Sequence, residues 1–170
     1  MPGGAEATLH KLKVMPQQAA IGESGRPLRA RSQSGCFVCG QDNPRGLQIR
    51  FQRQDDGGIT ATWAPASVWE GFHGIVHGGV VSTVLDEAMS KAVAGTGTEA
   101  LTAELRVRFR RHVTSNHGFF IRGWIVSRNK RMIKAEAVLV ATDGTEHAHA
   151  WATFLPLPHA NESGVTLVPR

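Results

Sequence analysis

The segment 74–89 joins a glycine-rich loop to a helical pattern and carries residues that could do chemistry. The loop contains His77, Gly78 and Gly79, and Asp86 follows nine residues after the histidine, in the second turn of the predicted helix. Glycine lets a backbone approach a substrate closely. The first amides of a helix have no intrahelical acceptor and point at whatever lies before them. A developing oxyanion would be stabilised there, so the segment favours acyl-transfer chemistry.

A helix from Val80 to Val93 is predicted by the spacing of its residues. Polar residues fall in adjacent pairs that recur every four positions, and apolar residues fill the other face. The polar residues are Ser82, Thr83, Asp86, Glu87, Ser90 and Lys91. An amphipathic helix whose acids are merely solvated would give the same pattern. The glycine-rich loop before the helix is what favours a functional role for Asp86.

The composition predicts one soluble domain. The chain has 170 residues, 41% of them hydrophobic. It contains no apolar run near the roughly 18 residues that a membrane span needs. Its N-terminal part lacks the continuous apolar core of a signal peptide, so we expect a cytoplasmic protein. A net charge of +5 and a pI near 9.9 suit a nucleic acid or a ligand with several phosphates, and charge alone does not choose between them.

Patterns along the chain indicate one ordered domain between two tails. Residues 1–33 contain several glycines and prolines and five Lys/Arg against two Glu, which predicts a flexible basic extension. We expect the domain at 34–158 and a C-terminal tail at 159–170. The last four residues of the tail resemble a protease-recognition sequence left by a tag, so they are excluded from fold reasoning.

Period-two alternation predicts strands on both sides of the helix. Leu47, Ile49 and Phe51 alternate with polar residues, and a turn at 55–58 leads to a second alternating run, Ile59–Trp63, which together predict a hairpin. Four strand-like runs follow the helix, at 100–113, 118–127, 131–142 and 146–157. Short turns between them imply an antiparallel sheet, and the one long apolar helix must pack against its concave face. The predicted fold class is α+β.

The first strand after the helix has a basic face. Alternation predicts that one set of residues points toward the helix: Leu101, Ala103, Leu105, Val107 and Phe109. The opposite face would carry Thr102, Glu104, Arg106, Arg108 and Arg110. A row of arginines is usually solvated surface, but guanidinium groups also bind phosphates well. Arg128, Lys130 and Arg131 lie near the turn between the predicted strands 118–127 and 131–142 and could add to such a site.

The two cysteines, Cys36 and Cys39, form a single Cys-x-x-Cys motif. A structural zinc site usually needs four ligands, and no second Cys or His pair with suitable spacing follows. We therefore interpret the pair as structural or incidental and expect no metal. Metal bound with additional ligands or across a dimer is the alternative.

Two histidine pairs could also hold a metal. His73 and His77 are four residues apart and could chelate a metal on a helix, but the glycines around them predict a loop. His147 and His149 share one strand face and could add ligands, although such a pair is more often simply exposed.

Together these motifs resemble the hotdog-fold acyl-CoA thioesterases, in the subgroup of phenylacetate-degradation and long-chain acyl-CoA thioesterases. The resemblance covers roughly residues 36 to 157. It rests on His77-Gly78-Gly79, Asp86 nine residues after the histidine, and Thr102-Ala103-Glu104-Leu105. The lead-in Cys36-Phe-Val-Cys39-Gly40, with the loop 43–47, also resembles bacterial members. Arg111-His112 departs from the Arg-Pro common among relatives, which bears only on the end of that strand.

The resemblance implies a homodimer or a dimer of dimers with active sites at the subunit interface. Asp86 would act as general base on a water, or as nucleophile, at the thioester carbonyl. Gly79, with Gly78, would offer backbone amides to the oxyanion. His77 would position the substrate, and Thr102 from the partner chain would help hold the attacking water.

Acyl-CoA is the substrate that the resemblance implies, so we expect neither a nucleic acid nor a membrane as partner. No cofactor is expected, because CoA is part of the substrate. Candidate walls for the acyl group are Trp69, Phe72 and Met89. Candidate phosphate-binding residues are Arg108, Arg110, Arg128, Lys130 and Arg131.

Two other readings of the same residues stay open. A non-hydrolytic acyl-CoA-binding or regulatory hotdog protein would bind acyl-CoA tightly without turnover. Hotdog dehydratases and hydratases fit less well, because they typically pair a catalytic histidine with a differently placed acid, often beside a proline-bearing loop that the segment 71–77 lacks.

Overall fold

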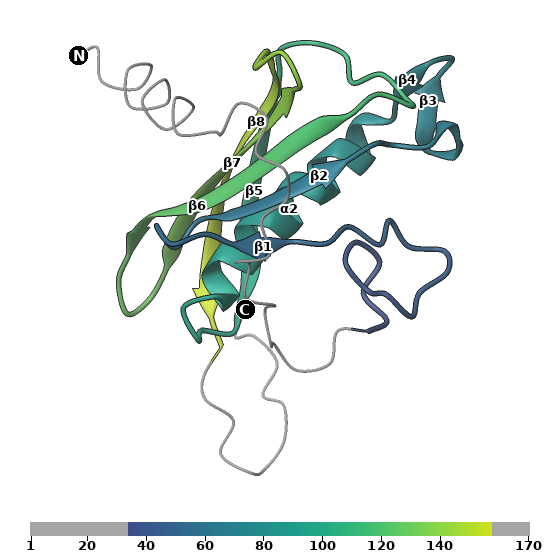
Figure 1. Ribbon diagram of the computed structural model, residues 1–170. Helices are drawn as coiled ribbons and strands as arrows, with labels where there is room; N and C mark the ends of the chain where they lie inside the picture. The colour runs from purple at the N-terminus through teal and green to yellow at the C-terminus, as the bar shows by residue number, and fades with distance from the viewer. Residues whose placement is uncertain (1–33, 158–170) are drawn as a thin grey trace, which may run out of the picture.

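A computed structural model of the protein describes residues 34–157, and Figure 1 shows how its elements are arranged. The extension predicted at 1–33 and the tail predicted at 159–170 lie outside the described residues. Within them, one long helix, α2 (Gly78–Ala94), packs along a six-stranded antiparallel sheet that curves around it. The predicted α+β fold with a central helix is confirmed. No helix in the described part of the chain is long and apolar enough to cross a membrane.

The six strands are arranged in the order β1-β2-β6-β7-β8-β5. Their bounds are β1 (Gln52–Arg53), β2 (Ile59–Trp63), β5 (Ala100–Phe109), β6 (Phe119–Arg128), β7 (Ile133–Ala141) and β8 (Glu146–Pro156). The four long strands match the four runs predicted after the helix. The hairpin predicted at 47–63 forms only in part, because just two residues of its first strand pair with β2.

The residues before β1 pair with the cysteine segment instead of with β2. The backbone N–H groups of Leu47 and Ile49 donate to the carbonyl oxygens of Phe37 and Val38, at 2.8 and 2.9 Å. This pairing satisfies the backbone of 47–49 and therefore shortens β1. It also holds the Cys-x-x-Cys turn against the body of the domain.

A small second sheet lies in the segment that the sequence predicts as a loop. A short 3-10 helix, η1 (Ser67–Trp69), leads into β3 (Glu70–Phe72) and β4 (Ile75–Val76). Gly74 makes the turn between these strands with a φ of +72°, a conformation that favours glycine. His77 follows β4 directly, and its N–H donates to the carbonyl oxygen of Trp69 at 2.9 Å. The hairpin therefore fixes the point at which the chain enters α2.

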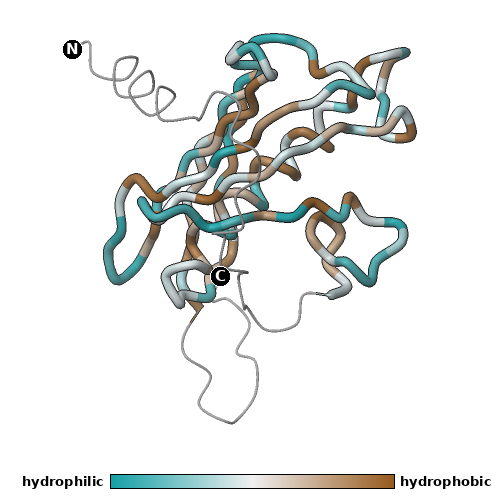
Figure 2. The backbone as a smooth tube through the Cα atoms, viewed as in Figure 1, coloured by the Kyte–Doolittle hydropathy of each residue, from teal (hydrophilic) through white to brown (hydrophobic). Residues whose placement is uncertain are grey.

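The core lies between α2 and the inner face of the sheet. The buried residues of the helix include Val84, Leu85, Ala88 and Met89, as the predicted periodicity requires. Gly123 of β6 allows the helix to come close, because a Cβ there would lie only 2.6 Å from the carbonyl oxygen of Ala88. In Figure 2 the tube alternates between hydrophobic and hydrophilic colours along the long strands, which is the pattern of a sheet with one face on a core.

The strand β5 forms an open edge of the sheet. It pairs with β8 on one side and has no strand on the other within residues 34–157. Most of its residues are exposed, including Leu101, Leu105 and Phe109, whose exposed fractions are 50%, 38% and 51%. A long edge strand that exposes apolar side chains is a favourable surface for pairing with another strand.

The outer face of the sheet carries a small cluster of its own. His149 is buried, with 4% of its surface exposed, so the expectation that it is simply exposed is wrong. Its ring stacks on Trp151 with 4.1 Å between centroids, and its Nε2 lies 3.1 Å from a carboxylate oxygen of Glu136. Arg106 in turn covers Trp151, 4.6 Å from the ring centroid. Aromatic and basic side chains from neighbouring strands thus cover one another on this face.

Candidate functional site

Asp86 and Thr102 form the polar contact at the centre of the candidate site. Asp86 lies on α2 and is half-buried, whereas Thr102 lies on the exposed edge strand β5. The Thr102 hydroxyl group donates to Oδ1 of Asp86 at 2.9 Å. The second carboxylate oxygen is the one through which Asp86 could act on a water or a carbonyl carbon.

This contact differs from the predicted alternation, since Thr102 lies on the face of β5 that reaches the Asp86 of its own chain. The reason is a β-bulge between Thr102 and Glu104, where Thr102 pairs with Phe154 and Glu104 with Thr153. The extra residue, Ala103, reverses the alternation N-terminal to it. Thr102 therefore shares the inner face with Phe154, and Leu101 does not face the helix as predicted. From Leu105 onward the predicted alternation matches the pairing with buried β8 residues.

The surroundings of Asp86 favour its protonated form. Burial raises the pKa of the carboxyl group, the hydrogen bond from Thr102 lowers it, and the negative charge of Glu87 raises it. The net result is a raised pKa. A carboxylate with a raised pKa is a better proton acceptor near neutral pH. Perturbed acids of this kind are common at functional sites, although structural networks also produce them.

His77 caps the N-terminus of α2 and packs against the loop glycines. Its Nδ1 accepts a hydrogen bond from the N–H of Gly79 at 3.0 Å. A Cβ on Gly71 would lie 3.0 Å from Cδ2 of the same ring, so the ring packs tightly against this glycine. Because Nδ1 accepts, a neutral His77 carries its proton on Nε2, which can donate to a ligand.

The amide that the sequence assigns to the oxyanion is therefore occupied in this structure. The N–H of Gly79 binds His77, and those of Val80 and Val81 donate to the His77 carbonyl oxygen at 2.9 and 3.2 Å. For the N–H of Gly78 the structure records no acceptor among residues 34–157. His73 lies in the turn between β3 and β4, so it does not share a helix with His77, as the glycines predict.

Asp86 and Gly79 lie on the same helix, but they are seven residues apart. At 1.5 Å per residue the helix separates them by about 10 Å along its axis. One thioester carbonyl cannot contact both groups of the same chain. The predicted pairing of acid and oxyanion amide therefore requires one of them from a second chain.

The predicted phosphate-binding residues fall into two groups within one chain. Arg108 lies toward the C-terminal end of β5, whereas Arg128 lies in the row of the sheet that also holds Thr102. Thr102 and Arg108 are six residues apart on β5, or roughly 20 Å at the rise of a strand. Arg110 forms an ion pair with Glu146, and Nη2 of Arg128 donates to the Thr98 hydroxyl group at 2.9 Å. One protomer does not gather them at one point.

Lys130 and Arg131 belong to the second of these groups. Both are exposed in the turn between β6 and β7. They therefore lie beyond Arg128, at the end of the sheet away from Arg108 and Arg110.

The predicted walls of the acyl site lie in three different environments. Met89 is fully buried in the core, and Phe72 is 79% exposed on β3. Trp69 packs against the core and meets Phe37 edge to face, with 5.9 Å between ring centroids.

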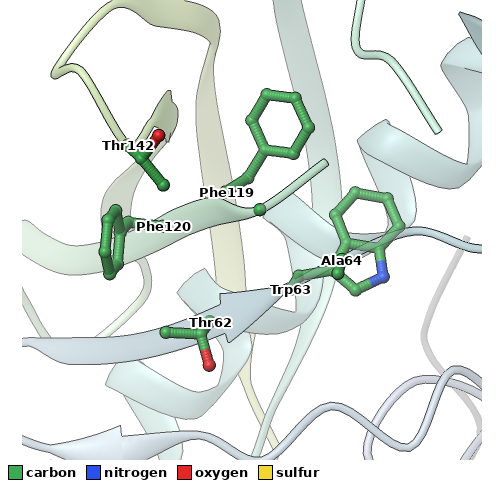
Figure 3. A pocket seen from close by; sticks show the side chains of 7 residues that line it. Thr62, Trp63, Ala64, Phe119, Phe120 and Thr142 are labelled. Atoms are coloured by element: carbon green, nitrogen blue, oxygen red, sulfur yellow. The ribbon is translucent and has the colours of Figure 1, made fainter. Parts of the chain in front are cut away.

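A hollow of about 250 Å³ lies elsewhere, at the end of β2 and the start of β6. Figure 3 shows Trp63, Phe119, Phe120 and Thr142 around it. None of the predicted site residues lines this hollow.

The cysteine pair meets the polar face of α2, which the sequence did not reveal. Cys36 Sγ lies 3.9 Å from Oε1 of Glu87, and Glu87 lies 3.4 Å from Nζ of Lys91. Lys91 belongs to the predicted polar face of the helix, but it is buried, with 7% of its surface exposed. Cys36, Cys39 and Glu87 place possible metal-ligand atoms within 4.8 Å of one another. Since 51 residues separate Cys36 from Glu87, no local pattern could have indicated the contact.

Comparisons with known proteins concern the same region. The profile of the thioesterase superfamily matches residues 73–148, from the loop before α2 into β8. No curated protein matches the chain significantly.

Solved structures resemble the whole domain. A crystal structure described as a thioesterase superfamily protein is 22% identical, with 89% of this chain and 74% of that chain covered and a TM-score of 0.71. The PaaI protein from the phenylacetic acid degradation operon of E. coli is 17% identical, with 66% and 81% covered and a TM-score of 0.62. A hypothetical thioesterase of Streptococcus pneumoniae with coenzyme A is 17% identical, with 64% and 87% covered and a TM-score of 0.60. At these identities the likeness concerns the fold.

Proposed function

We propose that this protein, which belongs to the thioesterase superfamily and has the hotdog fold, hydrolyses an acyl-CoA thioester to a free acid and CoA. The observation that carries the proposal is the half-buried Asp86 carboxylate, held by the Thr102 hydroxyl group beside the open edge of the sheet. An acid made more basic by burial can take a proton from a water that attacks a carbonyl carbon. The pneumococcal relative, crystallised with coenzyme A, supports a CoA ester as the substrate class.

A second feature of that relative supports the same two residues. It was also crystallised as two alanine variants, one of an aspartate and one of a threonine, whose sequence positions differ by 16. Asp86 and Thr102 are likewise 16 residues apart. The spacing is consistent with an equivalent acid and hydroxyl pair.

The site would be completed by a second copy of the chain. Because about 10 Å of helix separates Asp86 from Gly79, the Asp86 of one protomer would work with the partner's Gly79. The exposed apolar edge β5 supports such a homodimer, since pairing of two edges covers Leu101 and Leu105 and brings two sites together. A dimer of dimers remains compatible with this arrangement.

Hydrolysis can follow either of two routes. In the first, Asp86 takes a proton from water while the water oxygen attacks the thioester carbonyl carbon, and the tetrahedral intermediate then expels the CoA thiolate, which is protonated. In the second, the carboxylate attacks, CoA leaves, and water hydrolyses the mixed anhydride. Thr102 holds Oδ1 in both routes, so the other oxygen is presented to the reaction.

The oxyanion of the intermediate would be held at the N-terminus of the helix. The Gly78 N–H and the Nε2–H of His77 are the donors proposed for it. The Gly79 N–H would join them when the His77 ring turns away from it. His77 thereby both supports the loop and positions the carbonyl group.

The proposal is tested by measuring thiol release from a panel of aliphatic and aromatic acyl-CoA esters by the purified full-length chain. We expect catalysed release of CoA from at least one of them, in proportion to enzyme concentration. Calorimetric binding of acyl-CoA without any thiol release would contradict hydrolysis and favour the non-hydrolytic binding protein.

A further inference from the structure

The turn 36–40 is built so that both cysteine side chains face the same point on α2. The Gly40 N–H donates to the Cys36 carbonyl oxygen at 3.0 Å, which closes the turn. A Cβ on Gly40 would lie 2.4 Å from the carbonyl oxygen of Ser34, so only glycine fits there. The Val38 N–H points at Sγ of Cys36 at 3.4 Å, a contact that stabilises a thiolate.

The turn is held on the domain independently of the cysteines. Val38 is buried in the core, Phe37 packs against Trp69, and Leu47 and Ile49 pair with the backbone of the turn. The thiols are therefore placed above α2 by the fold. Neither cysteine forms a disulfide.

Two soft sulfur atoms and one carboxylate oxygen meet at this point, and all three groups are anionic when deprotonated. The two thiols and a carboxylate oxygen of Glu87 lie within 4.8 Å of one another. At a Zn–S distance of about 2.3 Å, small side-chain rotations would bring them onto one ion. Two thiolates, one carboxylate and the ammonium group of Lys91 carry a summed charge of −2, which a divalent cation balances.

We propose that Cys36, Cys39 and Glu87 bind one Zn²⁺ ion, with a water as the fourth ligand. Zinc is the expected metal because thiolate ligands in a tetrahedral arrangement select it over the hard cations Mg²⁺ and Ca²⁺. The ion would join the N-terminal turn to α2, with Lys91 beside it as a charge partner. We assign the ion a structural role because its ligands Cys36, Cys39 and Glu87 take no part in the contact between Asp86 and Thr102.

The test measures metal directly and does not depend on hydrolysis. The full-length chain is purified without chelators, and zinc is quantified by mass spectrometry in wild type, in Cys36→Ser/Cys39→Ser, in Glu87→Gln and in the exposed control Glu99→Gln. We expect one zinc ion per chain in wild type and in the control, and none in the double variant. Glu87→Gln should bind zinc about 10-fold or more weakly.

Cobalt provides a second readout on the unmodified chain. Co²⁺ added to reduced, metal-free wild type should give thiolate-to-metal charge-transfer bands together with the intense visible bands of tetrahedral coordination. A chelator should lower the thermal midpoint of wild type and leave that of the double variant unchanged. Zinc no more abundant in wild type than in the double variant, or cobalt bound without a thiolate band, would overturn the proposal. If wild type binds zinc but releases no thiol from acyl-CoA, that result counts against the proposed hydrolysis and not against the zinc site.

Discussion

Thr102→Val tests whether the hydroxyl group of Thr102 keeps Asp86 in its reactive state. Valine keeps the branched shape but cannot donate the 2.9 Å hydrogen bond to Oδ1 of Asp86. A hydrogen bond contributes about 0.5–1.5 kcal/mol net to stability. We use this range and not the higher one for hydrogen bonds to charged groups, because Thr102 is exposed to solvent. Since 1.36 kcal/mol corresponds to a factor of ten in rate, kcat/KM should fall about 2-fold to 10-fold.

The pH dependence of kcat/KM should also shift in a defined direction in Thr102→Val. The hydrogen bond from Thr102 lowers the pKa of Asp86 against the larger effect of burial, and Glu87 raises it further. Removing the hydroxyl group should move the acid limb of kcat/KM to higher pH, because the deprotonated acid is the active form.

The assay is thiol release from one acyl-CoA across pH 4 to pH 9, with Thr102→Ser as the variant that keeps a hydroxyl group. Serine should restore most of the rate and the position of the acid limb. A Thr102→Val enzyme with unchanged rate and unchanged acid limb would refute the role given to this contact.

Further predictions concern assembly and stability. Leu105→Arg should make the protein monomeric in light scattering, because it puts a charge on the β5 edge. Val126→Arg, on the exposed part of β6, is the control and should leave the dimer intact. A wild type that is monomeric at micromolar concentration would contradict the dimer. Gly123→Ala should lower the free energy of unfolding by about 1–3 kcal/mol in urea titrations, since its Cβ would lie 2.6 Å from the Ala88 carbonyl oxygen; an unchanged midpoint would deny this close approach. Asp86→Asn should melt at a higher temperature than wild type at neutral pH. The raised pKa of Asp86 means that wild type loses stability as the buried acid ionises with rising pH, so the difference should fade in acid. A lower melting temperature of Asp86→Asn at neutral pH would contradict this prediction.

Local patterns predict the helix and the four long strands of the domain. The apolar spacing of 80–93 predicts α2 because a helix with one face on a sheet needs that period, and Asp86 follows from the same pattern. The alternating runs predict the four long strands for the equivalent reason. The α+β hotdog fold inferred from these motifs is confirmed, and the thioesterase superfamily profile matches residues 73–148. The narrower subgroup stays a prediction.

Contacts between distant segments could not be predicted in this way. The bulge at Ala103 depends on how β5 aligns with β8, and no local residue pattern indicates it, so Thr102 was assigned to the wrong face. The meeting of Cys36 with Glu87 depends on the docking of the N-terminal turn. Alternation likewise placed Arg108 on a strand without showing how far it lies from Arg128.

The most direct test of the central claim is the turnover rate of Asp86→Asn on the best acyl-CoA substrate. Asparagine keeps the shape and the hydrogen bond from Thr102 but removes the charge and the basicity. We expect kcat to fall about 100-fold or more with acyl-CoA still bound in calorimetry, since general-base catalysis contributes at least that much. Glu87→Gln, one residue further along α2 and about 100° around it, should retain most of the activity. Wild-type turnover by Asp86→Asn, together with loss of turnover in a folded Glu87→Gln, would contradict the assignment of Asp86 as the reacting acid.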